Sequence, residues 1–221
     1  IEIRFMTAKD EDILTSEALL KKNLAIDRLL ENLIVADVEP STLLVGDRSA
    51  ILIAARISAY GREYSVKVRC EECFATNEIE YNLKSAVLQE NCFDREFLRD
   101  NSVSFNRETN TFDLVLPNSG VQVGLRLVDG RKERKYSDKE TSKNLVTSLL
   151  SLFLVKVDGR LDFDSVMDFI DVMPAGDSKF LRGLFPLLTP SIKLLKSYRC
   201  ETCYAQQELE VPLSAEFFWP K

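Results

Sequence analysis

The chain has 221 residues, of which 45% are hydrophobic, and its formal net charge is −6. This apolar content supports a sizeable core and excludes global disorder, while the acidic balance gives no general attraction for nucleic acid. The chain has no histidine, which excludes Ser–His and Cys–His nucleophile pairs and every imidazole base or metal ligand. No apolar run reaches the roughly 20 residues of a membrane span, and no secretory signal is visible. We therefore expect neither an enzyme nor a membrane protein.

Residues 1–63 are expected to form an N-terminal strand followed by helices. Apolar and charged residues alternate over residues 1–6, which predicts a strand. Thr7 and Asp10 have the spacing of a capping box, and the helical apolar pattern that follows extends to Ile34. The apolar face of this helix consists of Ile26, Leu29, Leu30, Leu33 and Ile34.

The next elements surround the first Cys-x-x-Cys segment. A second helix is expected over residues 47–60, with Gly61 as its C-terminal stop. Residues 64–69 alternate as a strand, and residues 78–83 have the pattern of a returning strand. We therefore expect residues 64–85 to form a knuckle hairpin.

Residues 86–191 are expected to contain a central hairpin and a helical region. Residues 84–111 are polar and mixed, and their pattern predicts no particular element. Two predicted strands, 112–116 and 121–127, flank a Pro-Asn-Ser-Gly turn.

Helices are then predicted over residues 137–154, from Asp162 onward, and over residues 177–185, where Pro186 ends or kinks the helix.

Residues 192–221 carry the second knuckle hairpin and an aromatic C-terminus, whose rings either pack on the protein's own core or anchor in a neighbouring protein. Strands and helices mix without a steady β-α-β alternation. We therefore expect an α+β fold with short antiparallel strands, in one compact unit closed by zinc.

The two Cys-x-x-Cys segments belong to an internal repeat. Residues 69–83 and 199–213 align at a constant offset of 130, and eight of the fifteen pairs are identical. Each segment has the pattern of an incoming strand, a knuckle and an outgoing strand. The repeat therefore predicts two similar hairpins, each of which presents two thiols.

Four cysteines in two such knuckles predict a structural zinc site of the zinc-ribbon kind. A knuckle turns both sulfurs toward one point, and two knuckles complete a tetrahedron at about 2.3 Å from the zinc. Four thiolates leave no open coordination position, so the ion would stabilise the fold and not catalyse a reaction. The predicted ligands are Cys70, Cys73, Cys200 and Cys203. The fifth cysteine, Cys92, is predicted to be reduced, partly buried and without a role.

Other thiol chemistries remain open alternatives. Two disulfides would need an oxidising compartment, and the sequence shows no secretory signal. A thioredoxin-like redox pair would need a helix after its first cysteine, whereas the residues after both knuckles have strand patterns. An iron–sulfur cluster suits four thiolates, but the spacing differs from that of ferredoxins.

Beyond the knuckles, five short segments follow one another along the chain. They are Ile3-Arg4-Phe5-Met6-Thr7, Ala59-Tyr60-Gly61, Val157-Asp158-Gly159, Thr189-Pro190-Ser191-Ile192 and Phe217-Phe218-Trp219-Pro220. Together with the knuckles they resemble the baseplate hub and hub-assembly proteins of contractile-tailed phages of the T-even type, over most of the chain. The resemblance implies a non-enzymatic tail component or assembly factor that binds other tail proteins. It also implies a place in the host cytoplasm during assembly and in the baseplate of the virion.

Two classes of function follow. The first is a structural or assembly component of a phage tail baseplate hub with a structural zinc site, and no small-molecule substrate is expected. The alternative is a zinc-ribbon module that binds nucleic acid or acts in transcription. Acidic side chains near the knuckles disfavour this alternative because they repel phosphates. These side chains are Glu71, Glu72, Glu78, Glu80, Glu201, Glu208 and Glu210.

Overall fold

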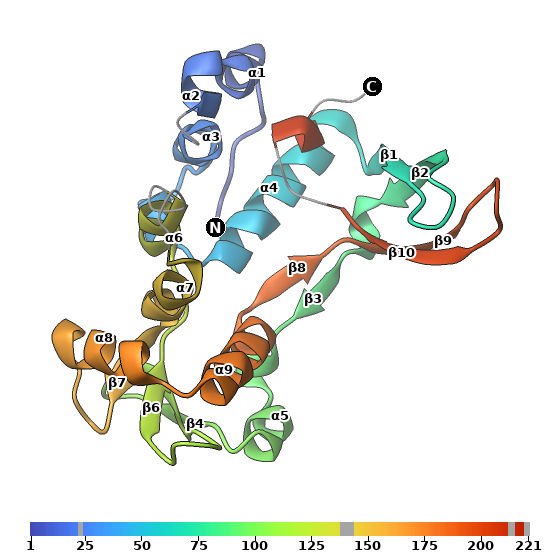
Figure 1. Cartoon of the computed structure of the whole chain (residues 1–221). Coiled ribbons are helices and arrows are strands. Elements are labelled where there is room, and N and C mark those ends of the chain that lie inside the picture. The colour runs from blue at the N-terminus through green and yellow to red at the C-terminus, as the bar shows by residue number, and fades with distance from the viewer. Residues whose placement is uncertain (22–23, 138–143, 212–214, 219–221) are drawn as a thin grey trace. The chain divides into compact units, whose positions relative to one another are not determined.

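The computed structural model describes residues 1–21, 24–137, 144–211 and 215–218 (Figure 1). The chain divides into two compact units. Unit 1 consists of Ile1–Pro40, Gly46–Leu88 and Ser191–Lys221, and unit 2 consists of Ser41–Val45 and Gln89–Pro190. Both units combine helices with short antiparallel strands, which confirms the predicted α+β class. No helix in the described ranges is long and apolar enough to cross a membrane.

Unit 1 contains a helical part and two hairpins. Its helices are α1 (Ala8–Thr15), α2 (Glu17–Lys21), α3 (Ala25–Leu33) and α4 (Val45–Tyr60), the last of which begins one residue before the unit boundary. The hairpins are β1 (Glu63–Arg69) with β2 (Thr76–Asn82), and β9 (Leu195–Arg199) with β10 (Gln206–Glu210). Two further short strands pair with each other, β3 (Val87–Gln89), which ends one residue past the unit boundary, and β8 (Ser191–Lys193).

Two expectations for the N-terminal region are wrong. The expected strand over residues 1–6 is reduced to a single bridge between Ile3 and Ile34, since Ile34 directly follows the end of α3 and the chain bends again at residues 36–37. The expected continuous helix is divided into α1, α2 and α3. The first division occurs at Ser16, which ends α1 in an extended conformation with ψ of 105°.

The core of unit 1 includes the predicted apolar face of α3, on which Leu29, Leu30 and Leu33 are fully buried. The core of unit 1 also includes a contact between α4 and the short 3-10 helix at Ala215–Phe218. The guanidinium of Arg56, which is only 2% exposed, donates from Nε to the carbonyl oxygen of Phe217 at 3.1 Å. Phe217 is itself buried, so the C-terminal segment belongs to the core of this unit.

Unit 2 is built on a four-stranded antiparallel sheet in the order β4-β5-β6-β7. Its strands are β4 (Ser104–Asn106), β5 (Thr111–Val115), β6 (Gln122–Leu125) and β7 (Leu154–Val157). Its helices are α5 (Arg95–Asp100), α6 (Gly130–Ser137), α7 (Leu145–Phe153), α8 (Phe163–Val172) and α9 (Ala175–Leu188). The described residues also form 3-10 helices at Pro40–Thr42, Leu83–Ser85 and Asn91–Phe93.

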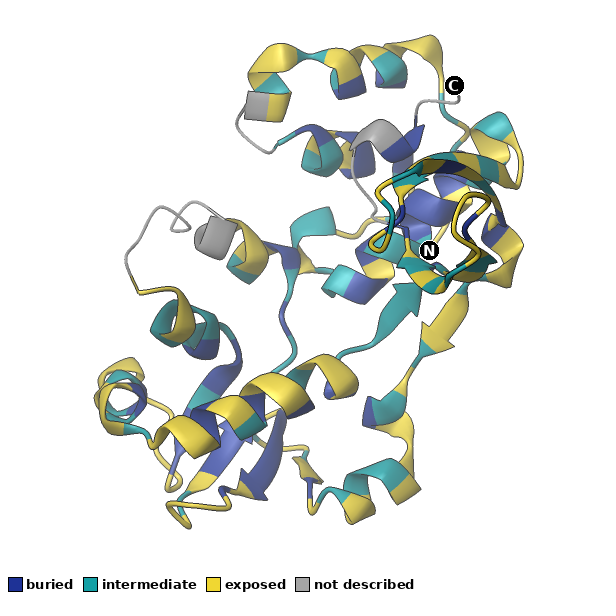
Figure 2. Ribbon diagram, turned by 45° about the vertical axis from the view of Figure 1, so that its right-hand side comes forward, coloured by how far each residue is buried: buried dark blue, intermediate teal, exposed yellow. Residues whose placement is uncertain are grey.

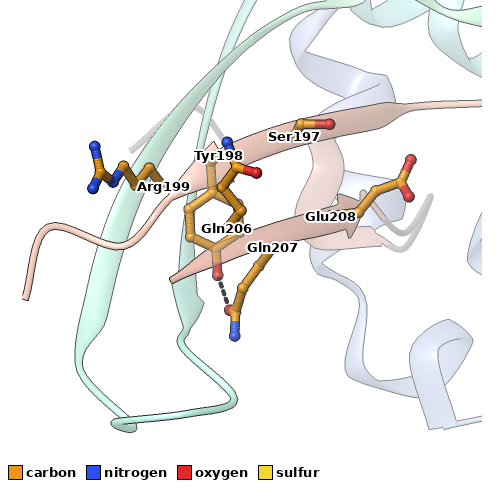
Figure 3. A pocket seen from close by; sticks show the side chains of 6 residues that line it. All are labelled: Ser197, Tyr198, Arg199, Gln206, Gln207 and Glu208. Atoms are coloured by element: carbon orange, nitrogen blue, oxygen red, sulfur yellow. Dashed lines mark hydrogen bonds between the residues drawn. The ribbon is translucent and has the colours of Figure 1, made fainter. Parts of the chain in front are cut away.

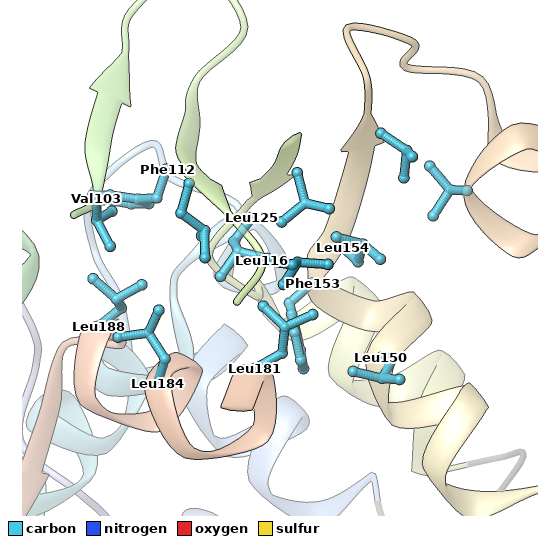
Figure 4. Packing of buried hydrophobic residues seen from close by; sticks show 14 of the residues in the cluster. Val103, Phe112, Leu116, Leu125, Leu150, Phe153, Leu154, Leu181, Leu184 and Leu188 are labelled. Carbon is cyan, nitrogen blue, oxygen red and sulfur yellow. The ribbon is translucent and has the colours of Figure 1, made fainter. Parts of the chain in front are cut away.

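The core of unit 2 lies between this sheet and its helices. Leu181, Leu184 and Leu188 of α9 are buried in one cluster with Phe112 and Leu125 of the sheet (Figure 4). In Figure 2 the strands of the sheet are mostly dark blue, whereas the outer turns of α9 are yellow, as expected for a helix with one core-facing stripe.

Two helix predictions in unit 2 need correction. Pro186, which was predicted to end or kink the helix, lies inside α9, and α9 continues to Leu188, so the helix does not end there. A proline so near the C-terminus removes only one hydrogen bond, and the side chain of Gln89 donates to the carbonyl oxygens of Pro186 at 2.7 Å and Thr189 at 3.2 Å. The predicted helix over residues 137–154 corresponds to the end of α6 and to α7, and residues 138–143 lie outside the described part.

A buried ion pair crosses the sheet. Lys156 of β7 and Asp113 of β5 are 8% and 7% exposed, and their Nζ and Oδ2 atoms are 2.7 Å apart. Gly124 of β6 stands between them in the register. A Cβ atom there would lie 2.8 Å from an Asp113 oxygen, so only glycine leaves room for the lysine side chain to reach the carboxylate.

Candidate metal centre

The first knuckle is the tight turn at the tip of the β1–β2 hairpin. The backbone N–H of Cys70 donates to the carbonyl oxygen of Ala75 at 2.9 Å, and the N–H of Phe74 donates to the carbonyl oxygen of Cys70 at 3.0 Å. Phe74 adopts a left-handed conformation with φ of 61°. This turn brings the Cys70 and Cys73 side chains to one side of the hairpin.

The second knuckle repeats this geometry 130 residues later. The N–H of Cys200 donates to Ala205 at 2.9 Å and the N–H of Tyr204 donates to Cys200 at 3.0 Å, with Tyr204 at φ of 62°. The strand registers also correspond, since Arg69 is paired with Thr76 and Arg199 with Gln206. The repeat in the sequence is therefore a repeat in the structure.

The two knuckles bring the four predicted cysteines together. Their Sγ atoms all lie within 4.8 Å of one another, and the Cys70–Cys203 and Cys73–Cys200 pairs are each 3.6 Å apart. A tetrahedron with metal–sulfur bonds of 2.3 Å has sulfurs roughly 3.8 Å apart, whereas a disulfide bond is about 2.05 Å long. The cysteines are free thiols, and their spacing fits a tetrahedral metal ion.

Two amide side chains connect the knuckles, and sequence reasoning missed both. The side-chain oxygen of Asn77 accepts the backbone N–H of Glu201 at 2.9 Å, and that of Gln207 accepts the N–H of Glu71 at 3.3 Å. Asn77 and Gln207 are equivalent in the repeat, so the two contacts are related by a pseudo-twofold axis. The only signal in the sequence was a pair of amides at the same offset of 130.

The electrostatics of the centre favour a bound cation. The backbone N–H groups of Cys203 and Thr202, and the side chain of Asn77, lower the pKa of Cys200 to about 6. The N–H of Ala205 lowers the pKa of Cys203, but burial and the neighbouring thiols outweigh it and raise that pKa to about 12. Four thiols so close together cannot all ionise without a positive ion among them, because each thiolate disfavours the next.

The hairpin that carries the second knuckle also borders a shallow cavity of about 530 Å³ (Figure 3). Six residues line it: Ser197, Tyr198, Arg199, Gln206, Gln207 and Glu208. The Tyr198 hydroxyl donates to the Gln207 side-chain oxygen at 2.8 Å. Tyr198 thus holds the amide that contacts the opposite knuckle, and burial together with the nearby thiols raises the pKa of its hydroxyl.

Other residues that the sequence indicated are not part of this cysteine group. Cys92 is a free, buried thiol in unit 2, and burial raises its pKa. At the C-terminus Phe217 and Phe218 are buried in unit 1, which confirms for them the expectation of packing on the protein's own core. Trp219 lies outside the described residues. Among those residues the four cysteines are the one group of potential ligands close enough to hold a metal ion.

Comparison with known proteins gives one match. No curated protein and no solved structure matches the chain. The family model described as "T4 bacteriophage base plate protein" matches residues 1–219, which is nearly the whole sequence and includes both knuckles and both units. The chain therefore belongs to the T4 bacteriophage base plate protein family.

Proposed function

We propose that this chain is a structural or assembly component of the baseplate hub, in which a single zinc ion joins the two hairpins of unit 1. The family places the chain in the tail of the virion and supports a non-enzymatic role. The observation that carries the zinc proposal is the cluster of four sulfurs within 4.8 Å, built from two equivalent knuckles.

The geometry of the four thiols and the energetics of structural metal sites both support zinc in this centre. Zinc takes four thiolates in a tetrahedron without a preference for another geometry, and such closed sites are structural. Binding of structural zinc contributes about 10–16 kcal/mol in small peptides, while a whole domain is stable by only about 5–15 kcal/mol. A site of this kind would decide whether the hairpins hold together.

The functional role that follows is to bind other tail proteins through surfaces that the zinc site positions. The ligands come from two distant parts of the chain, residues 70–73 and 200–203. The ion would therefore hold the last residues of unit 1 against its middle segment. Association with other tail proteins is what membership in a baseplate family implies, and specific assignment to the hub follows from the resemblance described above.

Metal analysis tests the zinc proposal directly. Purified protein should contain one zinc ion per chain, and Cys200→Ser should lose the ion and lower the melting temperature. Cys92→Ser is the matched control, because Cys92 lies in unit 2 and should leave the zinc content unchanged. A protein that folds fully, without any metal, in zinc-containing medium would contradict the proposal.

Co-expression with the other tail proteins of the same phage tests the assembly role. At least one of them should co-purify with the chain, and the complex should weaken after zinc is removed by a chelator. A chain that remains alone beside all of them would argue against the role. Filter binding with short DNA and RNA distinguishes the alternative function, a nucleic-acid-binding module, from the assembly role. Such a module would bind most strongly at low salt.

A further inference from the structure

Two aromatic side chains at the knuckles are exposed. Phe74 follows Cys73 and Tyr204 follows Cys203, so both residues flank the same sulfur cluster. They are 62% and 63% exposed. Large rings usually stabilise a fold by being buried, and these two rings contribute little in that way.

The backbone at both positions is also unfavourable for a large side chain. Phe74 has φ of 61° and Tyr204 has φ of 62°, in the left-handed region where a non-glycine residue costs about 1–2 kcal/mol. Glycine would adopt this conformation without strain. Both copies of the repeat therefore carry an exposed ring at a strained position, and strained residues cluster at functional sites.

An arginine stacks on each ring. The guanidinium carbons of Arg69 and Arg199 lie 5.1 Å from the ring centroids of Phe74 and Tyr204. In both knuckles Nε also donates to the carbonyl oxygen of the aromatic residue at 3.1 Å. Within the described ranges neither guanidinium has a carboxylate within ion-pair distance, so the outer N–H groups of both arginines are available to a partner.

We propose that Phe74 and Tyr204, each with its stacked arginine, form a docking surface for another baseplate protein. The surface fits a partner that offers an apolar socket to each ring and a carboxylate to each guanidinium. Aromatic residues and arginine are the residues most enriched among interface positions that dominate binding energy. This inference rests on the proposed function, because it names the surface through which that function acts.

Charge at the knuckles favours a protein over a nucleic acid. Glu71, Glu72 and Glu201 are exposed and lie within three residues of one of the two arginines in the sequence. A nucleic acid carries phosphates along its whole backbone and would meet these carboxylates as well as the guanidiniums. A protein can place a carboxylate opposite each arginine and a basic or neutral residue opposite each glutamate.

The test is the double substitution Phe74→Gly with Tyr204→Gly, which removes both rings and relieves the backbone strain. Folding and zinc content should be retained or improved, while association with co-expressed baseplate proteins should weaken at least about tenfold. Phe74→Asn with Tyr204→Asn is a second variant that still tolerates the left-handed conformation. Phe163→Ala is the control, because this ring in α8 of unit 2 is 68% exposed and should not affect association.

Each other outcome overturns the inference in a distinct way. If the wild-type chain binds baseplate proteins and both double variants bind them equally well, the docking surface is wrong and the proposed function stands. If both variants unfold or lose zinc, the rings are structural. If the wild-type chain binds none of these proteins, the proposed function fails together with the inference. Ring-dependent binding of a 15-nucleotide oligo-dT would identify a nucleic-acid surface instead.

Discussion

Replacing Lys156 by methionine should destabilise unit 2 strongly, although methionine is similar in length and more apolar. The substitution leaves the Asp113 carboxylate buried at 7% exposure without the ammonium that lies 2.7 Å from it. Breaking a buried ion pair by removing one partner typically costs about 3–5 kcal/mol. A loss of this size is a large fraction of the about 5–15 kcal/mol by which a domain is stable.

Urea denaturation of the variants measures this loss. The double variant Asp113→Leu with Lys156→Met removes both charges and should recover most of the stability, since a buried pair replaced by apolar side chains is often neutral. Arg62→Met is a surface control, because the Arg62–Glu63 pair is exposed and should contribute less than about 1 kcal/mol. A loss below about 1 kcal/mol for Lys156→Met would refute the reasoning.

The pH dependence gives an independent check. Burial raises the pKa of Asp113, but Lys156, Thr111 and Asn106 together lower it below its ordinary value. The wild-type carboxylate therefore stabilises the fold above pH about 4, and this contribution is lost as the pH falls through the folded-state pKa. Without Lys156 burial should dominate and raise the pKa, so the variant should gain stability as the pH falls from 7 toward 4. A Lys156→Met variant that loses stability as the pH falls from 7 toward 4 would contradict the conclusion that Lys156 keeps the Asp113 carboxylate ionised.

Three further substitutions are predicted from the same structure. Gly124→Ala should cost about 1–3 kcal/mol in thermal unfolding, since its Cβ would lie within 3 Å of both members of the ion pair. Arg56→Met should cost a similar amount and make the C-terminus more susceptible to limited proteolysis, because it removes the hydrogen bond to Phe217. Arg4 and Thr7 lower the pKa of Asp10 to about 2. The Asp10 carboxylate therefore stabilises the fold above pH about 4, and this contribution is lost as the pH falls toward 2. Asp10→Asn should flatten that acid transition when unfolding is followed by circular dichroism.

Local signals in the sequence predicted the elements that they control. The capping box of Thr7 and Asp10 is formed, with the Asp10 carboxylate accepting the Thr7 N–H at 2.9 Å. Gly61 ends α4 at a positive φ of 87°, and Gly120 closes the turn between β5 and β6. The repeat at an offset of 130 predicted which four thiols come together, because the two similar segments form similar hairpins.

Features that depend on distant neighbours were not predictable in this way. Charged residues such as Lys156 and Asp113 are expected on the solvent-facing side of a strand. Only the strand register across Gly124 shows that the two side chains are buried together. Residues 84–111 contain α5 and the edge strand β4, both too short to produce a clear periodic pattern. The contacts of Asn77 and Gln207 required knowing how one hairpin faces the other.

The separation of the two knuckles along the chain has a consequence for biosynthesis. The 126 residues between Cys73 and Cys200 must be translated before the second pair of thiols exists. At about 5–20 residues per second the ribosome needs roughly 6–25 s for this stretch. During that time the first two thiols have no partners, and the sequence of unit 2 emerges in full before unit 1 can close. A metal ion held by all four thiols could therefore complete its coordination only after Cys203 has been synthesised, so a chain interrupted within unit 2 would lack two of the four proposed ligands.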